Sequence, residues 1–330
     1  MSRRVNVYSI GNAIVDLQLK VSEEAFSELG LEKGSMNLID SSEQTALLSR
    51  LDSKDINKAS GGSAANSMIA VAQLGGSAAY GCLVGDDEFG KFYSTEMSEL
   101  GITLYTNPAE GGSTGSSVIL ITPDAERTMN TCLGVSAEFG PEHISSKIMK
   151  DSEWLFIEGY LFSTPKGQEA VRKAVSVAGK CGTRIAVTVS DAFIVDVFGE
   201  PLRETLKYAD LVFANYTEAE KYVGSGDDVI GRFQEEFTNS VVTRGSEGAV
   251  VNFDGVRSEI APVKTEAVDD TGAGDMFAGS FLYGISNGYD GQQAGNLASK
   301  LSSRIVSKLG PRLENDHLSD LDSIKVQIAA

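Results

Sequence analysis

The sequence predicts an α/β fold: a mostly parallel central sheet between two helical layers, with a small β-sheet lid. Two observations predict it. Short runs of β-branched and aromatic residues alternate with helical patterns along most of the chain, which is typical of a parallel sheet covered on both faces. Two other segments alternate apolar and polar residues with no long helix beside them, which favours half-exposed antiparallel strands.

The central sheet is predicted from runs that end in a polar residue or a glycine. These candidate strands are Val5–Ile10, Ala79–Val84, Trp154–Ile157, Arg184–Val189, Leu211–Ala214, Ser240–Thr243 and Gly248–Asn252. Between them lie helical patterns such as Ala65–Leu74, whose apolar residues recur on one face. In such sheets ligands bind beyond the carboxyl ends of the strands, so residues directly after these runs are candidate site residues.

The lid is predicted as an insertion into a single unit that spans residues 1–330. Its strands are expected at Ile14–Lys20, Met36–Asp40, Gly101–Thr106 and Ser116–Thr122. The lid would therefore be discontinuous, formed by residues from about 12–50 and 101–126, with the core from the remainder. The glycine-rich stretch Glu110–Gly115 is predicted to be a hairpin loop of this lid.

Composition excludes several classes of function. The formal net charge of −18 repels nucleic acid and anionic membranes, so neither is expected as a partner. No apolar run approaches the roughly 18 residues that a membrane span needs. The cysteines, Cys82, Cys132 and Cys181, are scattered and odd in number, which favours a reducing, cytoplasmic location over a disulfide framework or a zinc site.

The stretch VDDTGAGDMFAG, residues 268–279, predicts a strand-to-helix turn at Thr271–Gly274 with Asp275 opening the helix. Successive N–H groups at a glycine-rich helix start form an anion hole. Asp275 at its rim could accept a proton from an attacking hydroxyl. The alternative is an aspartate that only stabilises the first turn through the helix dipole.

Other motifs place polar residues beside predicted strands and helices. Gly61 and Gly62 precede the helix that contains Asn66, which suits close approach of a ligand to the backbone; the alternative is a glycine turn capped by Ser63. Asn12 follows the first strand, and Asp16, on a lid strand, could accept hydrogen bonds from two vicinal hydroxyls. A solvated strand residue is the alternative for Asp16.

Two further motifs carry charge or metal-binding potential. Asn215 and Glu218 share one face of a starting helix and could hold hydrated Mg²⁺, or simply form an N-cap with an acidic first turn. Arg127, at the exit of a lid strand, could contact a transferring phosphoryl group or be a surface charge. Gly111–Gly115 fits G-x-S-x-G, but it lacks the flanking strand, helix and histidine of a hydrolase.

Taken together and in order, these motifs resemble the ribokinase/PfkB family of carbohydrate and nucleoside kinases over nearly the whole chain. The signature D-T-x-G-A-G-D corresponds to Asp269–Asp275, with Asp270 departing from the usual Thr. The glycine pair with its following Asn, the N-x-x-E motif, and the stretch Val242–Gly248 also match. The resemblance implies a ribokinase-like fold and transfer of the ATP γ-phosphoryl group to a primary hydroxyl.

The resemblance also implies roles for individual residues. Asp275 would be the base, the N–H groups of Gly272, Ala273 and Gly274 would hold the developing charge, and Arg127 would approach the phosphates. Mg²⁺ would be organised by Asn215 and Glu218. The nucleotide would lie near Asn215, Thr243, Gly245, Gly248, Thr271 and Asn296. A monovalent cation such as K⁺ near the anion hole is a further property of the family.

Substrate choice is predicted from the N-terminal motif, Gly11–Asp16, which is similar to the adenosine-kinase branch. Substrate-binding residues would then be Asn12, Asp16, Gly61, Gly62 and Asn66. Against adenosine, Glu158 is an acid at a place where sugar kinases also use one to bind a substrate hydroxyl, so it is a further candidate. Tyr160 is a candidate for stacking on a base, whereas Phe162 fits core packing better. Adenosine is the preferred substrate; the alternatives are inosine, guanosine or cytidine, or a sugar, as in a ribokinase or fructokinase. An alternative from a different class of protein is a ligand sensor that keeps the fold without catalytic activity. Either a monomer or a homodimer is compatible with the sequence.

Overall fold

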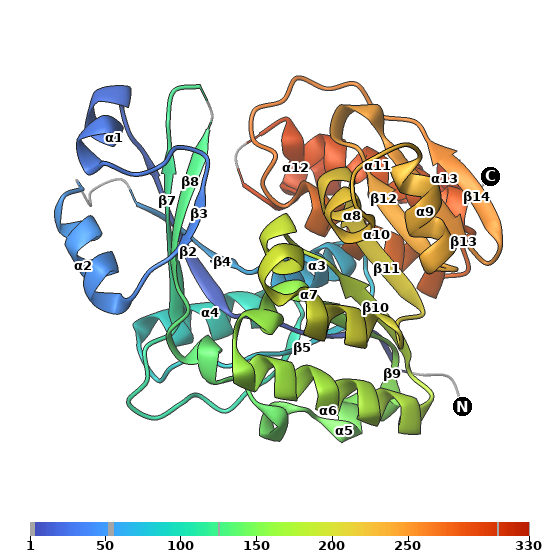
Figure 1. Cartoon of the computed structure of the whole chain (residues 1–330), viewed down its shortest axis with the longest axis horizontal. Coiled ribbons are helices and arrows are strands. Elements are labelled where there is room, and N and C mark those ends of the chain that lie inside the picture. Colours follow the sequence, from blue (N-terminus) through green and yellow to red (C-terminus); the bar gives the residue numbers. More distant parts are fainter. Residues whose placement is uncertain (1–3, 52–55, 125, 309, 330) are drawn as a thin grey trace.

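Two sheets of different size organise the chain (Figure 1), whose computed structural model describes residues 4–51, 56–124, 126–308 and 310–329. The large sheet contains β1 (Val5–Ile10), β5 (Ala78–Gly81), β6 (Thr103–Tyr105), β9 (Ser152–Glu158), β10 (Arg184–Thr188), β11 (Leu211–Asn215), β12 (Ser240–Thr243), β13 (Ala249–Phe253) and β14 (Val256–Ile260). Its strand order is β14-β13-β12-β11-β10-β9-β1-β5-β6. It is parallel from β6 to β12, and β13 and β14 extend it in antiparallel fashion.

Helices cover both faces of this sheet, as predicted. They are α3 (Ser63–Gln73), α4 (Glu88–Glu99), α5 (Ser146–Asp151), α6 (Pro165–Cys181), α7 (Ala192–Leu206), α8 (Tyr216–Val223), α9 (Val229–Glu236), α10 (Ala273–Ser286), α11 (Gly291–Val306), α12 (Asn315–Leu318) and α13 (Leu321–Ala329). Single 3₁₀ turns lie at Gly134–Glu138, Pro141–His143, Gly159–Ser163 and Gly245–Glu247.

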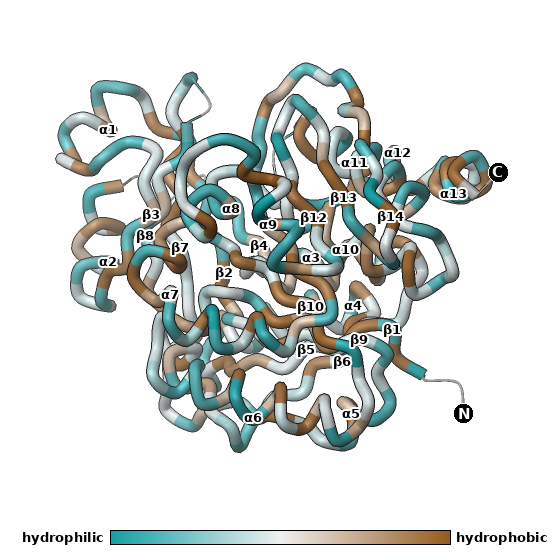
Figure 2. Tube along the Cα trace, turned by 45° about the vertical axis from the view of Figure 1, so that its right-hand side comes forward, coloured by the Kyte–Doolittle hydropathy of each residue, from teal (hydrophilic) through white to brown (hydrophobic). Residues whose placement is uncertain are grey.

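The side chains of β9 show how the two layers form. Trp154 and Phe156 pack into the cluster that contains residues of α3 and α10. Leu155 and Ile157 point to the other face and pack with α6 and α7. Successive side chains of a strand alternate between faces, so a strand that is apolar throughout must be covered on both sides. Figure 2 shows hydrophobic residues along the central strands β1, β9 and β10.

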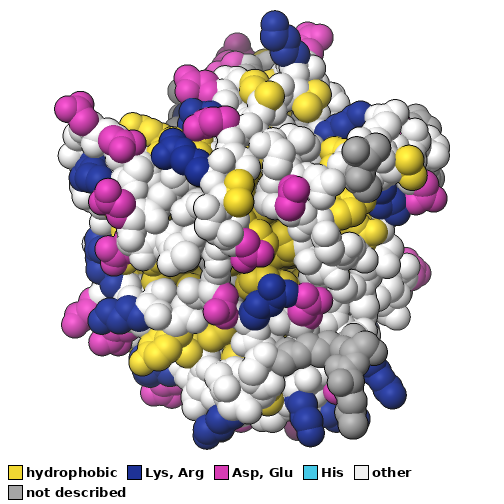
Figure 3. All heavy atoms as spheres, turned by 90° about the vertical axis from the view of Figure 1, so that its right-hand side faces the viewer, with side chains coloured by type: hydrophobic (Ala, Val, Ile, Leu, Met, Phe, Trp, Pro, Cys, Tyr) yellow, Lys and Arg dark blue, Asp and Glu magenta, His cyan; other side chains and the backbone are white. Residues whose placement is uncertain are grey.

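The acidic excess of the chain is not gathered into one patch on the face that Figure 3 shows. Basic and acidic side chains are interspersed there with small hydrophobic areas. Among the described residues, no helix combines the length and the apolar character that a membrane crossing requires.

The small sheet forms the lid. It contains β2 (Ile14–Lys20), β3 (Met36–Leu38), β4 (Asn57–Gly61), β7 (Gly115–Ile121) and β8 (Arg127–Cys132), in the order β3-β8-β7-β2-β4. Helices α1 (Glu23–Leu29) and α2 (Ser41–Ser49) lie on its outer side (Figure 1). From these helices Phe26 and Leu47 join the cluster that contains Leu17 and Val118, so the outer face of the lid is apolar and covered.

The structure differs from four expectations about the lid. Residues 101–106 do not belong to it, because β6 pairs with β5 at the edge of the large sheet. The predicted hairpin loop Glu110–Gly115 is instead a connection between the two sheets, and Gly111 N donates to Asp86 Oδ1 (3.0 Å) in the loop between β5 and α4. The lid strands β2 and β7 are buried rather than half-exposed, and they are parallel to each other, although β2 pairs with β4 and β7 pairs with β8 in the expected antiparallel way. The lid strands also extend to Gly61 and Cys132, beyond the predicted limits.

Gly62 lies where the chain leaves the lid and enters α3. It has φ of 101°, a conformation that side chains disfavour, and a Cβ there would overlap the carbonyl oxygen of Asn12. The glycine is therefore required both by its backbone conformation and by the close approach of the turn after β1.

We predict that Gly62→Ala destabilises the protein by several kcal/mol and abolishes ligand binding, because strain and overlap act together. Gly75→Ala is the matched control: its φ is 85°, but a Cβ there meets nothing within 4 Å. That variant should lose only about 1–2 kcal/mol. Denaturant unfolding of both variants measures the difference. Equal losses would mean that the contact with Asn12 is unimportant.

Candidate active site

Two cavities meet at Asp275. The lid cavity, about 240 Å³, lies between the lid and the large sheet and is lined by residues that include Asn12, Asp16, Asn66, Glu158 and Tyr160. The turn cavity is lined by residues that include Asn215, Glu218, Thr243, Ala273 and Gly274. Ser63, Ser190, Gly272 and Asp275 line both cavities. A group bound in one cavity can therefore reach a group bound in the other at this point.

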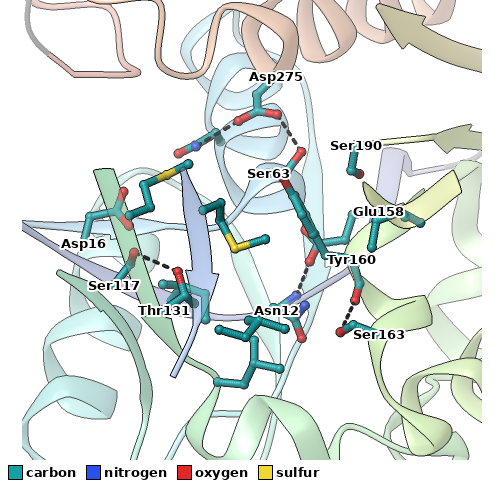
Figure 4. Close-up of a pocket in the computed structure, with 18 of the residues that line it drawn as sticks. Asn12, Asp16, Ser63, Ser117, Thr131, Glu158, Tyr160, Ser163, Ser190 and Asp275 are labelled. Carbon is teal, nitrogen blue, oxygen red and sulfur yellow. Dashed lines mark hydrogen bonds between the residues drawn. The ribbon is translucent and has the colours of Figure 1, made fainter. Parts of the chain in front are cut away.

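Asp275 is held by two donors from α3. Ser63 Oγ donates to Asp275 Oδ1 (2.6 Å), and Asn66 Nδ2 donates to Asp275 Oδ2 (3.0 Å), as Figure 4 shows. Burial raises the pKa of Asp275 to about 6, and these two hydrogen bonds oppose the rise. A carboxylate with this pKa is ionised at neutral pH. Because its pKa is within about one unit of neutral pH, it can also take up a proton during a reaction.

The turn before Asp275 differs from its predicted form. No strand precedes it: β14 ends at Ile260, and Val268 N instead bonds to Val306 O (2.8 Å) at the end of α11. Gly272 is the N-cap of α10 with φ of 72° and has no side-chain cap. Ala273 N donates to the Asp270 carbonyl oxygen (3.1 Å), whereas Gly272 and Gly274 border the turn cavity without a side-chain cap, an arrangement that favours anions.

Arg127 forms a buried ion pair rather than facing solvent. Its Nη1 donates to Asp269 Oδ1 at 2.9 Å, and the two side chains are 8% and 3% exposed. Asp269 also accepts from Thr271 N (3.0 Å) and Gly310 N (2.7 Å). Burial disfavours the charge of Asp269, but these bonds and the charge of Arg127 outweigh it and hold its pKa below the usual value. In this conformation Arg127 joins the lid to the turn, and Arg127 Nε and Nη2 are buried without a partner.

Glu158 binds backbone groups, although the sequence suggested a substrate hydroxyl as its partner. Its two carboxylate oxygens accept from Asn12 N (2.7 Å) and Ala64 N (2.8 Å). Burial raises the pKa of Glu158 to about 7, which the two backbone bonds oppose. Glu158 lines the lid cavity, but its main contacts tie the turn after β1 to the start of α3.

Asp16 faces the lid cavity from β2. It is 7% exposed, which contradicts the alternative of a solvated strand residue. Its carboxylate lies against Gly61, where a Cβ would come within 2.5 Å of Asp16 Oδ2. Burial raises the pKa of Asp16 to about 7; the charges of Arg127 and Arg312 lower it, whereas Asp275 and Glu96 raise it.

Asn215 and Glu218 form a capping box at the start of α8. Glu218 N donates to Asn215 Oδ1 (2.8 Å), while Asn215 N and Nδ2 donate to the two oxygens of Glu218 (3.0 and 2.7 Å). Burial raises the pKa of Glu218 to about 7. Because a carboxylate has about four acceptor positions, Glu218 can still bind water molecules of a hydrated cation. Among the described residues, no group of three or more His, Cys, Asp or Glu could hold a metal directly.

The predicted nucleotide residues are only partly brought together. Thr243 ends β12 and lines the turn cavity with Asn215. Gly245, Gly248, Thr271 and Asn296 line neither cavity. Asn296 is exposed on α11 and accepts from Gln292 Nε2 (3.2 Å).

Several cavity residues escaped sequence analysis. Ser63 does not cap α3, because its hydroxyl binds Asp275. Ser190 lies after β10 with a φ of 75°, unusual for a residue other than glycine. Phe193 lines the lid cavity and is 40% exposed, and Tyr160 lines it too, whereas Phe162 is buried in the core. Of the residues that escaped, Ser190 alone had a signal in the sequence: it directly follows a predicted strand, and ligands bind beyond strand ends.

Similar proteins identify the class to which this fold and site belong. The adenosine kinase from Sinorhizobium meliloti superposes with a TM-score of 0.90 at 34% identity, over 99% of this chain and 100% of that one. A probable sugar kinase from Rhizobium etli superposes with a TM-score of 0.91 at 33% identity, over 99% of both chains. Adenosine kinase of Saccharomyces cerevisiae is 25% identical over 94% of this chain and 97% of its own length. The protein is thus a kinase with a ribokinase-like α/β fold.

The family follows from a second comparison. The pfkB family carbohydrate kinase profile matches residues 34–318, most of the chain. The chain belongs to the PfkB family.

We predict that Glu158→Gln lowers the free energy of unfolding by about 1–3 kcal/mol, because an amide offers one acceptor to two buried N–H donors. Glu153→Gln on the same strand is the control: Glu153 pairs with Arg184 at the surface, and the variant should lose under about 1 kcal/mol. Denaturant unfolding compares the two. Unchanged stability of the Glu158 variant, together with weaker substrate binding, would instead make Glu158 a substrate ligand.

Proposed function

We propose that the protein is an ATP- and Mg²⁺-dependent nucleoside kinase that phosphorylates the 5′-hydroxyl of adenosine. The observation that carries this proposal is the mixed lining of the lid cavity. Asn12, Asp16 and Asn66 supply polar groups suited to ribose hydroxyls, while a large part of the remaining lining is apolar. A nucleoside has this same division between a hydroxylated sugar and a base with apolar faces.

The apolar wall comes from two sides of the cavity. Met36, Ile119 and Met129 belong to lid strands, and Phe193 and Ile194 belong to α7. Methionine and phenylalanine make favourable contacts with flat aromatic surfaces. A free sugar has hydroxyl groups on every side, and hydroxyls buried against such a wall would lose hydrogen bonds to water without replacement. This contrast favours a nucleoside over a sugar.

The charge of the cavity favours a neutral substrate. Asp16, Glu158 and Asp275 all line it, and Figure 4 shows that they approach it from different elements. An anionic substrate such as a sugar phosphate would be repelled by these carboxylates. Adenosine carries no charge at neutral pH, so it meets this requirement.

The proposed mechanism uses the junction of the two cavities. The substrate hydroxyl lies beside Asp275, its oxygen bonds to the γ-phosphorus, and the bond from that phosphorus to the bridging oxygen breaks to release ADP. Asp275 takes the hydroxyl proton. The N–H groups of Gly272 and Gly274 stabilise negative charge on the transferring group. The N–H group of Ala273, which the sequence also assigned to this role, donates to the Asp270 carbonyl oxygen and would have to exchange that bond for one to the phosphoryl group. Arg127, with its unpaired Nε and Nη2, adds positive charge near the turn.

Mg²⁺ would be held through its water molecules by Glu218, with Asn215 fixing that carboxylate, and its charge would offset that of the phosphates. The monovalent cation suggested by the family stays a prediction.

A sugar kinase is the second candidate. Ser117, Thr131, Ser163 and Ser190 also line the lid cavity and could bond to additional hydroxyls. The likeness to the Rhizobium etli probable sugar kinase supports this alternative, and the likeness to the two adenosine kinases supports the first. Other nucleosides and a ligand sensor without turnover remain the alternatives to test beside it.

An assay of ADP release over adenosine, inosine, guanosine, cytidine, ribose and fructose tests the proposal. We expect adenosine to give the highest kcat/KM and the free sugars to give little turnover, because they leave the apolar wall unfilled. Turnover of ribose or fructose without any nucleoside would replace the proposal by the sugar-kinase alternative. Thermal stabilisation by a ligand with no ADP release would instead indicate a sensor.

Asp275→Asn should lower kcat by roughly 10²–10⁴-fold with little change in ATP affinity, because the base is lost while shape is kept. In the unaltered enzyme the base acts when ionised, and its pKa is raised to about 6. Hence kcat should be constant above pH 7 and fall about tenfold per pH unit below pH 6. Steady-state kinetics from pH 5 to 9 and ATP titration measure both effects. Near-normal kcat in the variant would remove Asp275 as the base.

A further inference from the structure

The segment Gly310–Leu313 contacts the turn before α10 at two points and the end of α3 at a third. Gly310 N donates to Asp269 Oδ2 (2.7 Å). Pro311 packs over Gly272, where a Cβ would overlap it. Leu313 is bonded at both its N–H and its carbonyl to the side chain of Gln73 at the end of α3 (3.3 and 2.8 Å). The segment is thus fixed against the turn before α10 and against α3.

Arg312 connects this fixed segment to the lid. Its Nη1 donates to Glu96 Oε1 on α4 (2.6 Å), and its Nη2 donates to the carbonyl oxygen of Ser60 on β4. Glu96 Oε2 accepts from Ser60 N (2.7 Å) and from the Ser60 hydroxyl. Ser60 is completely buried, and every polar group that it carries is therefore bound within this cluster of Arg312, Glu96 and Ser60.

The cluster is directly connected to the predicted hydroxyl-binding residues. Ser60 precedes Gly61, whose carbonyl accepts from Tyr93 OH (3.0 Å) and whose Cα lies against the carboxylate of Asp16. Asp16 itself is opposite Ala59 in the β2–β4 pair. A displacement of Ser60 would therefore move both the glycine pair and the strand that carries Asp16.

We propose that Arg312 is a positioning residue for the substrate hydroxyls: its forked contacts to Glu96 and Ser60 hold β4 and the glycine pair in place against Asp16. This inference rests on the proposed function, in which Asp16 binds two hydroxyls of the substrate. Arginine is suited to the role because its planar guanidinium can bind a carboxylate and a carbonyl at once, which lysine cannot match. Arg312 does not line the lid cavity, so it acts through its neighbours.

Arg312 also affects the charge state of Asp16. Four charged groups act on this carboxyl: Arg127 from β8, Arg312 from the C-terminal segment, Asp275 from α10 and Glu96 from α4. Both arginines lower its pKa, and both acids raise it. Ionised Asp16 accepts hydrogen bonds from hydroxyls on both carboxylate oxygens, whereas protonation turns one of those oxygens into a donor. Removing Arg312 should therefore raise the pKa of Asp16. As the pH falls, the variant should then lose substrate binding at a higher pH than the unaltered enzyme does.

The test compares Arg312→Met with Arg304→Met. Arg304 makes a similar paired contact with Asp320 (2.6 and 2.7 Å) and is similarly exposed, 20% against 17% for Arg312, but it contacts neither cavity. Arg312→Met should raise KM for adenosine roughly tenfold or more with kcat within about threefold, since ground-state binding is lost. It should also move the acidic fall of kcat/KM to higher pH. Arg304→Met should change neither quantity, although both variants lose stability.

Two further variants separate the possible failures. Arg312→Lys keeps the charge and should restore the pH profile while leaving KM raised. Asp16→Asn should raise KM by itself; if it does not, the proposed role of Asp16 fails. If Asp16→Asn raises KM while Arg312→Met leaves it unchanged, or if Arg304→Met raises KM equally, the inference about Arg312 is wrong.

Should Arg312→Met not fold, Glu96→Gln replaces it. That variant weakens the same cluster but removes a negative charge, so KM should rise while the acidic fall of kcat/KM moves to lower pH. A normal KM in Glu96→Gln would overturn the proposal.

Discussion

The carboxylate of Glu158 is the constraint on which the geometry of the site depends. It ends β9 at the centre of the large sheet and accepts one backbone N–H from the turn after β1 and another from the start of α3. Those two elements carry Asn12, Ser63 and Asn66. Because Ser63 and Asn66 then hold Asp275, the position of the base on α10 follows from a carboxylate on a different strand. Gly11 and Gly62 allow this close packing, since side chains at either position would overlap their neighbours.

Such a site concentrates negative charge. Asp16, Glu158, Glu218 and Asp275 all have pKa values raised by burial, and Asp275 raises the pKa of each of the others. At Glu158 and Glu218 backbone N–H bonds oppose this rise in pKa, whereas at Asp16 two arginines oppose it. A protein with a formal net charge of −18 therefore places its few site cations where a carboxylate must remain ionised.

Sequence patterns predicted which segments form strands and helices better than they predicted strand pairing and side-chain contacts. The apolar runs of β1 and β9–β12 and the glycine-rich start of α10 have local signals, and their types were predicted correctly. β4 has the sequence NKASG, which contains no apolar alternation, so it escaped prediction. The short strand β6 was assigned to the wrong sheet because strand pairing depends on register over long distances, which no local pattern encodes. Residue types at Asp275, Asn66 and Asn215 indicated chemistry, but the ion pair of Arg127 with Asp269 spans 142 positions and could not be foreseen.

Two arginine contacts join the lid to the core beside the cavity. Arg127 binds Asp269 from the lid, and Arg312 binds Ser60 from the core, so a guanidinium crosses the boundary in each direction. Ion pairs of this kind give modest net stability, because desolvation offsets most of the attraction. Their contribution is therefore mainly geometric: they hold the lid against the core. A lid held in this way keeps water away from the reacting groups, which is what transfer of a phosphoryl group to a hydroxyl rather than to water requires.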